Sequence, residues 1–183
     1  MIVGLMGRAG VGKTHVQLLV APLFSNCLDL DQLGHQCLKD PSVETCLVDC
    51  FGESILENES VSRQHLREKA FVSNETISQL NQCVHPVMQA HVEDWVQSTK
   101  KGLIVGALIY EIGIAQMCDV IVTIDASDES ILKRSANRKD ILNYQKSRQW
   151  YIDHSDIHIH NTWDETFDLN CQTTFNQIVL NLE

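Results

Sequence analysis

The chain has 183 residues, of which 44% are hydrophobic and 21% are charged, and its formal net charge is −10. This composition excludes a fibrous or intrinsically disordered protein and supplies enough apolar residues for a buried core. The acidic balance opposes binding to nucleic acids and anionic membranes, and the apolar runs fall far short of the roughly 20 residues of a membrane span. We therefore expect a cytoplasmic globular protein with no nucleic-acid or membrane partner, as a monomer or small homo-oligomer.

The first element is an apolar run over residues 2–6 that predicts a strand, and the eight residues after it match the phosphate-binding pattern GxxxxGK(S/T). These eight are Gly7, Arg8, Ala9, Gly10, Val11, Gly12, Lys13 and Thr14. Glycines let backbone N–H groups turn toward phosphate oxygens, at the positive end of the helix that follows. We expect Lys13 to reach the β- and γ-phosphates and the Thr14 hydroxyl to ligate Mg²⁺. The motif predicts a nucleoside triphosphate and leaves the reaction open.

A second strand is expected over residues 26–30, and two carboxylates, Asp29 and Asp31, stand at its end. Ligands of open α/β folds bind at the carboxyl edge of the sheet, and phosphoryl transfer needs a carboxylate near the acceptor hydroxyl or the metal. Strand alternation would place Asp29 and Asp31 on the same side. The alternative is that both begin a turn and cap a helix from Gln32 onward.

Residues 31–101 contain no convincing strand. Residues 61–71 and 75–98 show helical periodicity, and we expect the second helix to be interrupted near Pro86. This stretch is interpreted as a helical insertion that covers a second substrate. Further strands are expected over residues 103–108, 120–124 and 157–160. The chain is therefore predicted to be a single α/β domain with a parallel five-stranded sheet flanked by helices, with its core in residues 1–30 and 102–183.

Four groups of side chains need interpretation. Six basic residues cluster between positions 133 and 148, either as cations for a polyphosphate or as a solvated helix face; they are Lys133, Arg134, Arg138, Lys139, Lys146 and Arg148. His158 and His160 could be metal ligands with Asp156, although polar positions on an edge strand are the preferred interpretation. Seven cysteines, an odd number without a CxxC pair, indicate neither a disulfide framework nor a thiolate zinc site, so we expect them to be reduced. Trp95, Trp150 and Trp163 are expected to pack in the core from helices.

Taken together, the motifs resemble the dephospho-coenzyme A kinase family over most of the chain. The matching stretches are residues 2–14, 28–31, 51–52, 61–71, 84–86, 118–122 and 156–161, together with Glu111, Arg134, Arg138 and Gln145. The resemblance implies a fold of the P-loop nucleotide kinase type and transfer of the ATP γ-phosphate to the ribose 3′-hydroxyl of dephospho-coenzyme A. It implies ATP and Mg²⁺ as cofactors.

The resemblance also implies roles for individual residues. Asp31 resembles the base or acceptor-orienting carboxylate, and Lys13 and Arg138 resemble catalytic cations on the transferred phosphate. Arg134 is expected to contact the nucleotide. The acceptor side is expected to use Asp29, Arg63, Arg67, His85 and Glu111. The lid of this chain, about residues 137–146, is shorter than is usual in the family, since residues 139–144 alone separate Arg138 from Gln145.

Three other classes of protein share parts of this pattern. Another P-loop small-molecule kinase would have the same fold with a different acceptor, and the short lid is compatible with a degenerate, non-catalytic nucleotide-binding protein. A GTPase is suggested by Asp31-Gln32-Leu33-Gly34, which matches DxxG, and by residues 137–140, which resemble NKxD. The DxxG motif follows the phosphate loop too closely to leave room for a switch segment and a strand, which argues against the GTPase.

Overall fold

A computed structural model describes residues 1–134, 142 and 144–182 of the chain, which divide into two compact units. The first unit comprises residues 1–30 and 95–183, and the second comprises residues 31–94. The predicted lid, with Arg138, lies mostly outside the described residues. Within the described part of the chain, no helix is both long and apolar enough to span a membrane.

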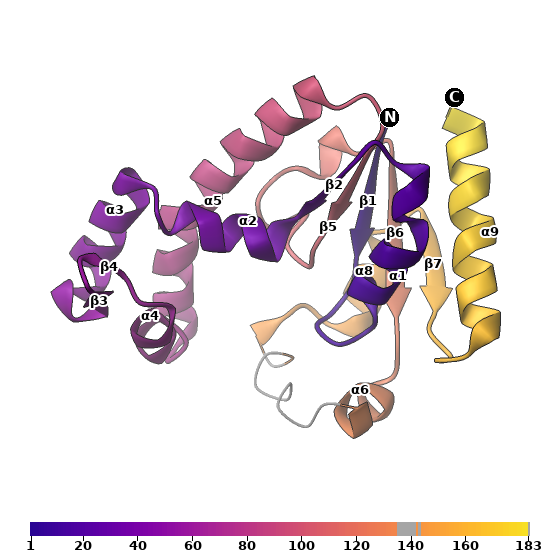
Figure 1. The fold of residues 1–183 in the computed structure, drawn as a ribbon. Coiled ribbons are helices and arrows are strands. Elements are labelled where there is room, and N and C mark those ends of the chain that lie inside the picture. The colour runs from indigo at the N-terminus through magenta and orange to yellow at the C-terminus, as the bar shows by residue number, and fades with distance from the viewer. Residues whose placement is uncertain (135–141, 143, 183) are drawn as a thin grey trace. The chain divides into compact units, whose positions relative to one another are not determined.

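The first unit contains a five-stranded sheet in the order β2-β5-β1-β6-β7, in which every neighbouring pair is parallel (Figure 1). Its strands are β1 (Ile2–Met6), β2 (Asn26–Asp29), β5 (Gly102–Val105), β6 (Val120–Asp125) and β7 (Ile157–His160). All five lie close to the expected positions, which confirms the predicted fold class. The strand expected over residues 103–108 is shorter because the chain leaves the sheet after Val105.

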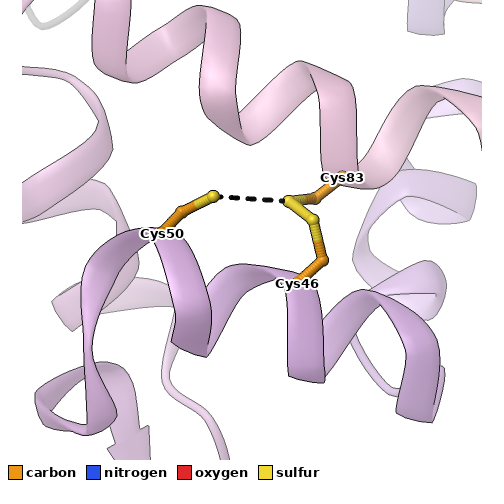
Figure 2. A group of neighbouring side chains, drawn as sticks. All are labelled: Cys46, Cys50 and Cys83. Carbon is orange, nitrogen blue, oxygen red and sulfur yellow. Dashed lines mark hydrogen bonds between the residues drawn. A yellow bond between two sulfur atoms is a disulfide. The ribbon is translucent and has the colours of Figure 1, made fainter.

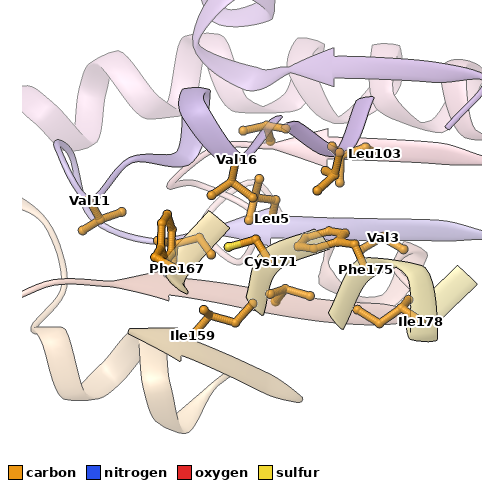
Figure 3. Packing of buried hydrophobic residues seen from close by; sticks show 14 of the residues in the cluster. Val3, Leu5, Val11, Val16, Leu103, Ile159, Phe167, Cys171, Phe175 and Ile178 are labelled. Carbon is orange, nitrogen blue, oxygen red and sulfur yellow. The ribbon is translucent and has the colours of Figure 1, made fainter. Parts of the chain in front are cut away.

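Helices of the first unit flank this sheet; some lie between consecutive strands in the sequence and one follows the last strand. They are α1 (Lys13–Val20), α6 (Asp128–Arg134), α8 (Arg148–Asp153) and α9 (Glu165–Leu182), with short 3₁₀ turns η1 (Ala21–Leu23) and η3 (Ala115–Met117). On one face, Val3 and Leu5 of β1 pack with Val16 of α1 and with Phe167 and Phe175 of α9 (Figure 3). On the other face, Gly4 of β1 lies against the side chains of residues 109, 118 and 121.

The second unit consists mainly of helices. Its elements are α2 (Leu30–Cys37), α3 (Pro41–Phe51), η2 (Glu53–Ile55), β3 (Leu56–Glu57), β4 (Ser60–Val61), α4 (Arg63–Ala70) and α5 (Asn74–Ser98). The boundaries of the unit fall inside two helices, so that α2 belongs to it from residue 31 onward and α5 up to residue 94. The start of α3 is fixed by Asp40, whose carboxylate accepts a hydrogen bond from Ser42 N at 2.8 Å, and by Pro41 in the first helical turn.

Three sequence-based expectations for the second unit are wrong. The stretch contains a short antiparallel hairpin, β3–β4, whose turn residues Asn58 and Glu59 have positive φ. A two-residue strand is too short to show an alternation of apolar and polar side chains. Helix α5 is not interrupted at Pro86, since the helix continues through this residue and buries Val84 and Met88 on either side of it.

The third correction concerns the cysteines. Cys46 of α3 and Cys83 of α5 form a disulfide, with their Cα atoms 5.7 Å apart (Figure 2). An odd number of cysteines does not exclude a disulfide between two of them. The two partners are 37 residues apart, so no local sequence pattern predicts their pairing. The remaining five cysteines are free, as expected.

Candidate active site

The phosphate loop joins the carboxyl end of β1 to the first turn of α1, as the motif predicts. Gly7 has a φ of +143° and Gly12 a φ of +104°. A Cβ at Gly7 would lie 2.2 Å from Ile124 O, and one at Gly12 would lie 2.6 Å from Asn161 Nδ2. Both positions therefore require glycine on steric as well as conformational grounds. The loop ends where α1 exposes its first backbone N–H groups, the usual place for an anion.

Lys13 folds back over this loop. Its ammonium group donates hydrogen bonds to Gly7 O at 2.8 Å and to Arg8 O at 3.1 Å. The next residue, Thr14, is exposed at the start of α1. One cation and one hydroxyl therefore lie at the helix end where the backbone favours negative charge.

Two amide side chains from distant parts of the chain hold the loop. Asn161 directly follows β7 and is 3% exposed; its Nδ2 donates to Val11 O at 2.7 Å, and its Oδ1 accepts from Trp163 N at 2.7 Å. Gln145 Oε1 accepts a hydrogen bond from Ala9 N at 2.8 Å. The loop is thus fixed on both sides by side chains from the second half of the chain.

Arg8 connects the loop to the residues that follow β6. Its side chain is buried, with Nη2 donating to Ala126 O at 3.0 Å and Nη1 lying 2.6 Å from a carboxylate oxygen of Asp128. The Arg8 guanidinium therefore pairs with the segment between β6 and α6.

The carboxylate of Asp125, at the end of β6, is the centre of a charged cluster. Arg148 Nε donates to Oδ1 at 2.7 Å and Arg148 Nη2 donates to Oδ2, while His160 Nδ1 and His158 Nε2 lie 3.1 and 3.4 Å from Oδ2. Burial of Asp125 opposes its ionisation, but the hydrogen bonds from Arg148, His160 and His158 outweigh that effect and lower its pKa to about 2. His158 and His160, for which polar positions on an edge strand were preferred over metal ligands, are thus neighbours of a carboxylate already paired with an arginine.

Glu111 and Arg134 also belong to the first unit. Burial raises the pKa of Glu111 despite the favourable charge of Lys146, and its buried Oε2 lacks a hydrogen-bond partner among the described residues. The Arg134 guanidinium lies 4.2 Å from the centroid of the Trp163 ring, a cation–π contact. Trp163 lies outside any helix and has a φ of +64°, so its expected helical position is wrong.

The remaining predicted residues lie at the end of β2 and in the second unit. Asp29 ends β2, whereas Asp31 lies in the first turn of α2. The argument from strand alternation is therefore wrong, because the backbone becomes helical at Leu30. Within the second unit, Arg63 Nη1 lies 3.2 Å from His35 Nδ1. Arg67 is exposed on the same helix, α4, and His85 is partly buried on α5.

Sequence reasoning assigned no role to Asn161, Gln145 or Asp125. Asn161 and Gln145 were within the stretches that carry the family resemblance, which was the one available signal. Asp125 ends a strand of a parallel sheet, so its place at the carboxyl edge could have marked it for attention.

A phosphate loop between the first strand and the first helix of this parallel sheet defines the chain as a nucleotide-binding protein of the P-loop class. The solved structure of dephospho-CoA kinase from Campylobacter jejuni has the same fold, with a TM-score of 0.73, 17% identity and coverage of 100% of this chain and 98% of that one. Shikimate kinase from Bacteroides thetaiotaomicron shares the fold at a TM-score of 0.58, with 12% identity and 98% coverage of both chains.

The family follows from the sequence comparisons. The family model for dephospho-CoA kinase matches residues 1–162. Dephospho-CoA kinase from Aggregatibacter actinomycetemcomitans is 32% identical over 176 residues, covering 89% of this chain and 84% of the relative. The enzyme of the same name from Dehalococcoides mccartyi is 32% identical over 143 residues, covering 75% and 72%. The chain belongs to the dephospho-CoA kinase family, and its activity is the ATP-dependent phosphorylation of dephospho-coenzyme A to coenzyme A.

Proposed function

We propose that this chain transfers the γ-phosphate of ATP to the ribose 3′-hydroxyl of dephospho-coenzyme A, using the phosphate loop for ATP and Asp31 for the acceptor. The observation that carries the proposal is the position of Lys13, whose ammonium group lies over the loop carbonyls of Gly7 and Arg8. This position supports the proposal, because a cation held beside the loop needs little reorganisation to neutralise charge on the phosphate chain.

The nucleotide side of the site uses the loop backbone, Lys13 and Arg134. The N–H groups of the loop and of the first turn of α1 bind phosphate oxygens, and Lys13 neutralises charge on the β- and γ-phosphates. Gly7 and Gly12 have positive φ, which lets the loop backbone turn its N–H groups toward phosphate oxygens, and the exposed Thr14 hydroxyl follows Lys13 directly, so these residues suit a magnesium nucleotide. Mg²⁺ held by Thr14 would supply charge neutralisation at the phosphate oxygens.

The acceptor side uses carboxylates and cations. Asp31, two residues beyond the end of β2, orients the 3′-hydroxyl and accepts its proton as the oxygen attacks the γ-phosphorus. Arg63, Arg67 and His85 supply donors for the pyrophosphate of the acceptor. Asp29 and Glu111 complete the proposed acceptor contacts, and Arg138 remains the proposed lid cation.

A kinase assay with ATP, Mg²⁺ and dephospho-coenzyme A tests the proposal, with the phosphorylated position assigned by NMR spectroscopy. Asp31→Asn is expected to lower kcat by about 10²-fold or more, while ATP affinity measured by calorimetry stays unchanged. Asp49→Asn is a matched control, because Asp49 is an exposed carboxylate on α3 in the same unit; this variant should behave like the wild type.

Other results would contradict the assignment. Phosphorylation at another hydroxyl would refute the 3′ position, and turnover of shikimate or a nucleoside in preference to dephospho-coenzyme A would favour another P-loop kinase. ATP binding without turnover of any acceptor would indicate a degenerate protein. Loss of ATP binding in Asp31→Asn would reassign Asp31 to the metal.

A further inference from the structure

The second unit contains a cluster of three cysteine sulfur atoms that phosphoryl transfer does not use. Cys46 and Cys50 are four residues apart on α3, and Cys83 faces them from α5 (Figure 2). All three sulfur atoms lie within 4.8 Å of one another, and Cys50 Sγ is 4.0 Å from Cys83 Sγ. Residues four apart on a helix share one face, so α3 presents two sulfur atoms to the same point.

We propose that the reduced cluster of Cys46, Cys50 and Cys83 is a binding site for one thiophilic divalent ion of the zinc type. Zinc–sulfur bonds are about 2.3 Å long, so two thiolates on one tetrahedral ion lie about 3.8 Å apart. The separation of 4.0 Å between Cys50 and Cys83 already fits this arrangement. Three protein ligands leave a fourth position for water.

The ion and the disulfide exclude each other. In the structure, Cys46 and Cys83 share a bond, which occupies two of the three ligands. A dithiol reduces this disulfide by thiol–disulfide exchange: the dithiol gives up two electrons and two protons and becomes a disulfide, and Cys46 and Cys83 become thiols. A divalent ion then displaces the protons of three thiols and bonds to three thiolates. Either state links α3 to α5, so the ion replaces the covalent link in the reduced chain.

The exposure of the cysteine cluster lets an ion enter it from solvent and leave it again. Cys50 is exposed, Cys46 is partly buried and Cys83 is 6% exposed, so the cluster is open on the Cys50 side and closed on the Cys83 side. Soft thiolate ligands select zinc and cadmium over magnesium and calcium, which prefer oxygen. The site is therefore chemically distinct from the Mg²⁺ site proposed at Thr14.

The test is a titration of the reduced full-length chain with Cd²⁺ under anaerobic conditions without nucleotide, followed by ultraviolet thiolate-to-cadmium absorption. We expect one ion bound with the absorption of three thiolates, and its displacement by Zn²⁺. Because loss of even an outer contact to a metal ligand typically costs 10- to 100-fold in affinity, Cys50→Ser should weaken binding by about 100-fold or more. Cys27→Ser, which alters a cysteine of β2 outside the cluster, is the matched control and should bind like the wild type.

Two further measurements test the metal site: the absorption of the disulfide-bonded chain and the effect of Zn²⁺ on the unfolding temperature. Chain in which mass spectrometry confirms the Cys46–Cys83 disulfide should lack the three-thiolate absorption, and Zn²⁺ should raise the unfolding temperature of the reduced wild type but not of Cys50→Ser. The exposed position of Cys50 makes a folding defect in that variant unexpected. Equal binding by the wild type and Cys50→Ser, by the reduced and disulfide-bonded chains, or no thiolate absorption at all would overturn the proposal.

Discussion

The most direct prediction concerns the two hydrogen bonds of Asn161, one to Val11 O of the phosphate loop and one from Trp163 N, which we call the Asn161 clamp. In Asn161→Ala, Val11 O loses its donor and Trp163 N loses its acceptor, both at a site where the side chain is 3% exposed. Each lost bond removes about 1 kcal/mol, and buried groups without partners add further desolvation cost. We expect the variant to lose about 2 to 4 kcal/mol of unfolding free energy. The loop should also lose its fixed position, so KM for ATP should rise.

Urea denaturation and steady-state kinetics measure the two effects. Asn161→Asp retains an acceptor for Trp163 N but places a carboxylate oxygen against Val11 O, so it should be no more stable than Asn161→Ala near neutral pH. Asn170→Ala is the matched control, because Asn170 is exposed on α9 and its loss should change stability by about 0.5 kcal/mol or less. The clamp interpretation fails if Asn161→Ala and Asn170→Ala match the wild type equally well in stability and in KM for ATP.

Three further predictions concern charged side chains. Lys13→Ala should lower kcat by about 10²-fold or more with the fold retained by circular dichroism, and unchanged turnover would contradict the role of Lys13. Replacing both Arg63 and Arg67 by alanine should raise KM for dephospho-coenzyme A by about 10- to 100-fold and leave KM for ATP little changed; an equal rise in both would indicate a folding defect. Because the pKa of Asp125 falls from 3.8 to about 2 on folding, its ionised form contributes about 2 kcal/mol above pH 4, and this contribution is lost as the pH falls toward 2. Asp125→Asn should be less stable than the wild type in urea at pH 7 and should lack this part of the acid dependence; equal pH profiles would show that the cluster contributes nothing.

The sequence by itself determined the features that depend on neighbouring residues. The phosphate loop was predictable because glycines, a lysine and a threonine at fixed spacing after an apolar run specify a strand, a turn and a helix start. The five strands of the sheet were predictable because short runs rich in β-forming residues recur along the chain and most of them are separated by helical patterns. The family was predictable from several such local motifs in order along the chain, and a single motif would have named the ligand class alone.

The tertiary structure decided the features that depend on residues far apart along the chain. Asn161 and Val11 are 150 residues apart, and Gln145 and Ala9 are 136 apart, so no local pattern shows that they pair. Packing also overrode local preference where α5 continues through Pro86. The Cys46–Cys83 disulfide and the position of Cys50 beside it depend on the packing of α3 against α5. The spacing of the cysteines along the sequence does not show which of them meet in the folded chain.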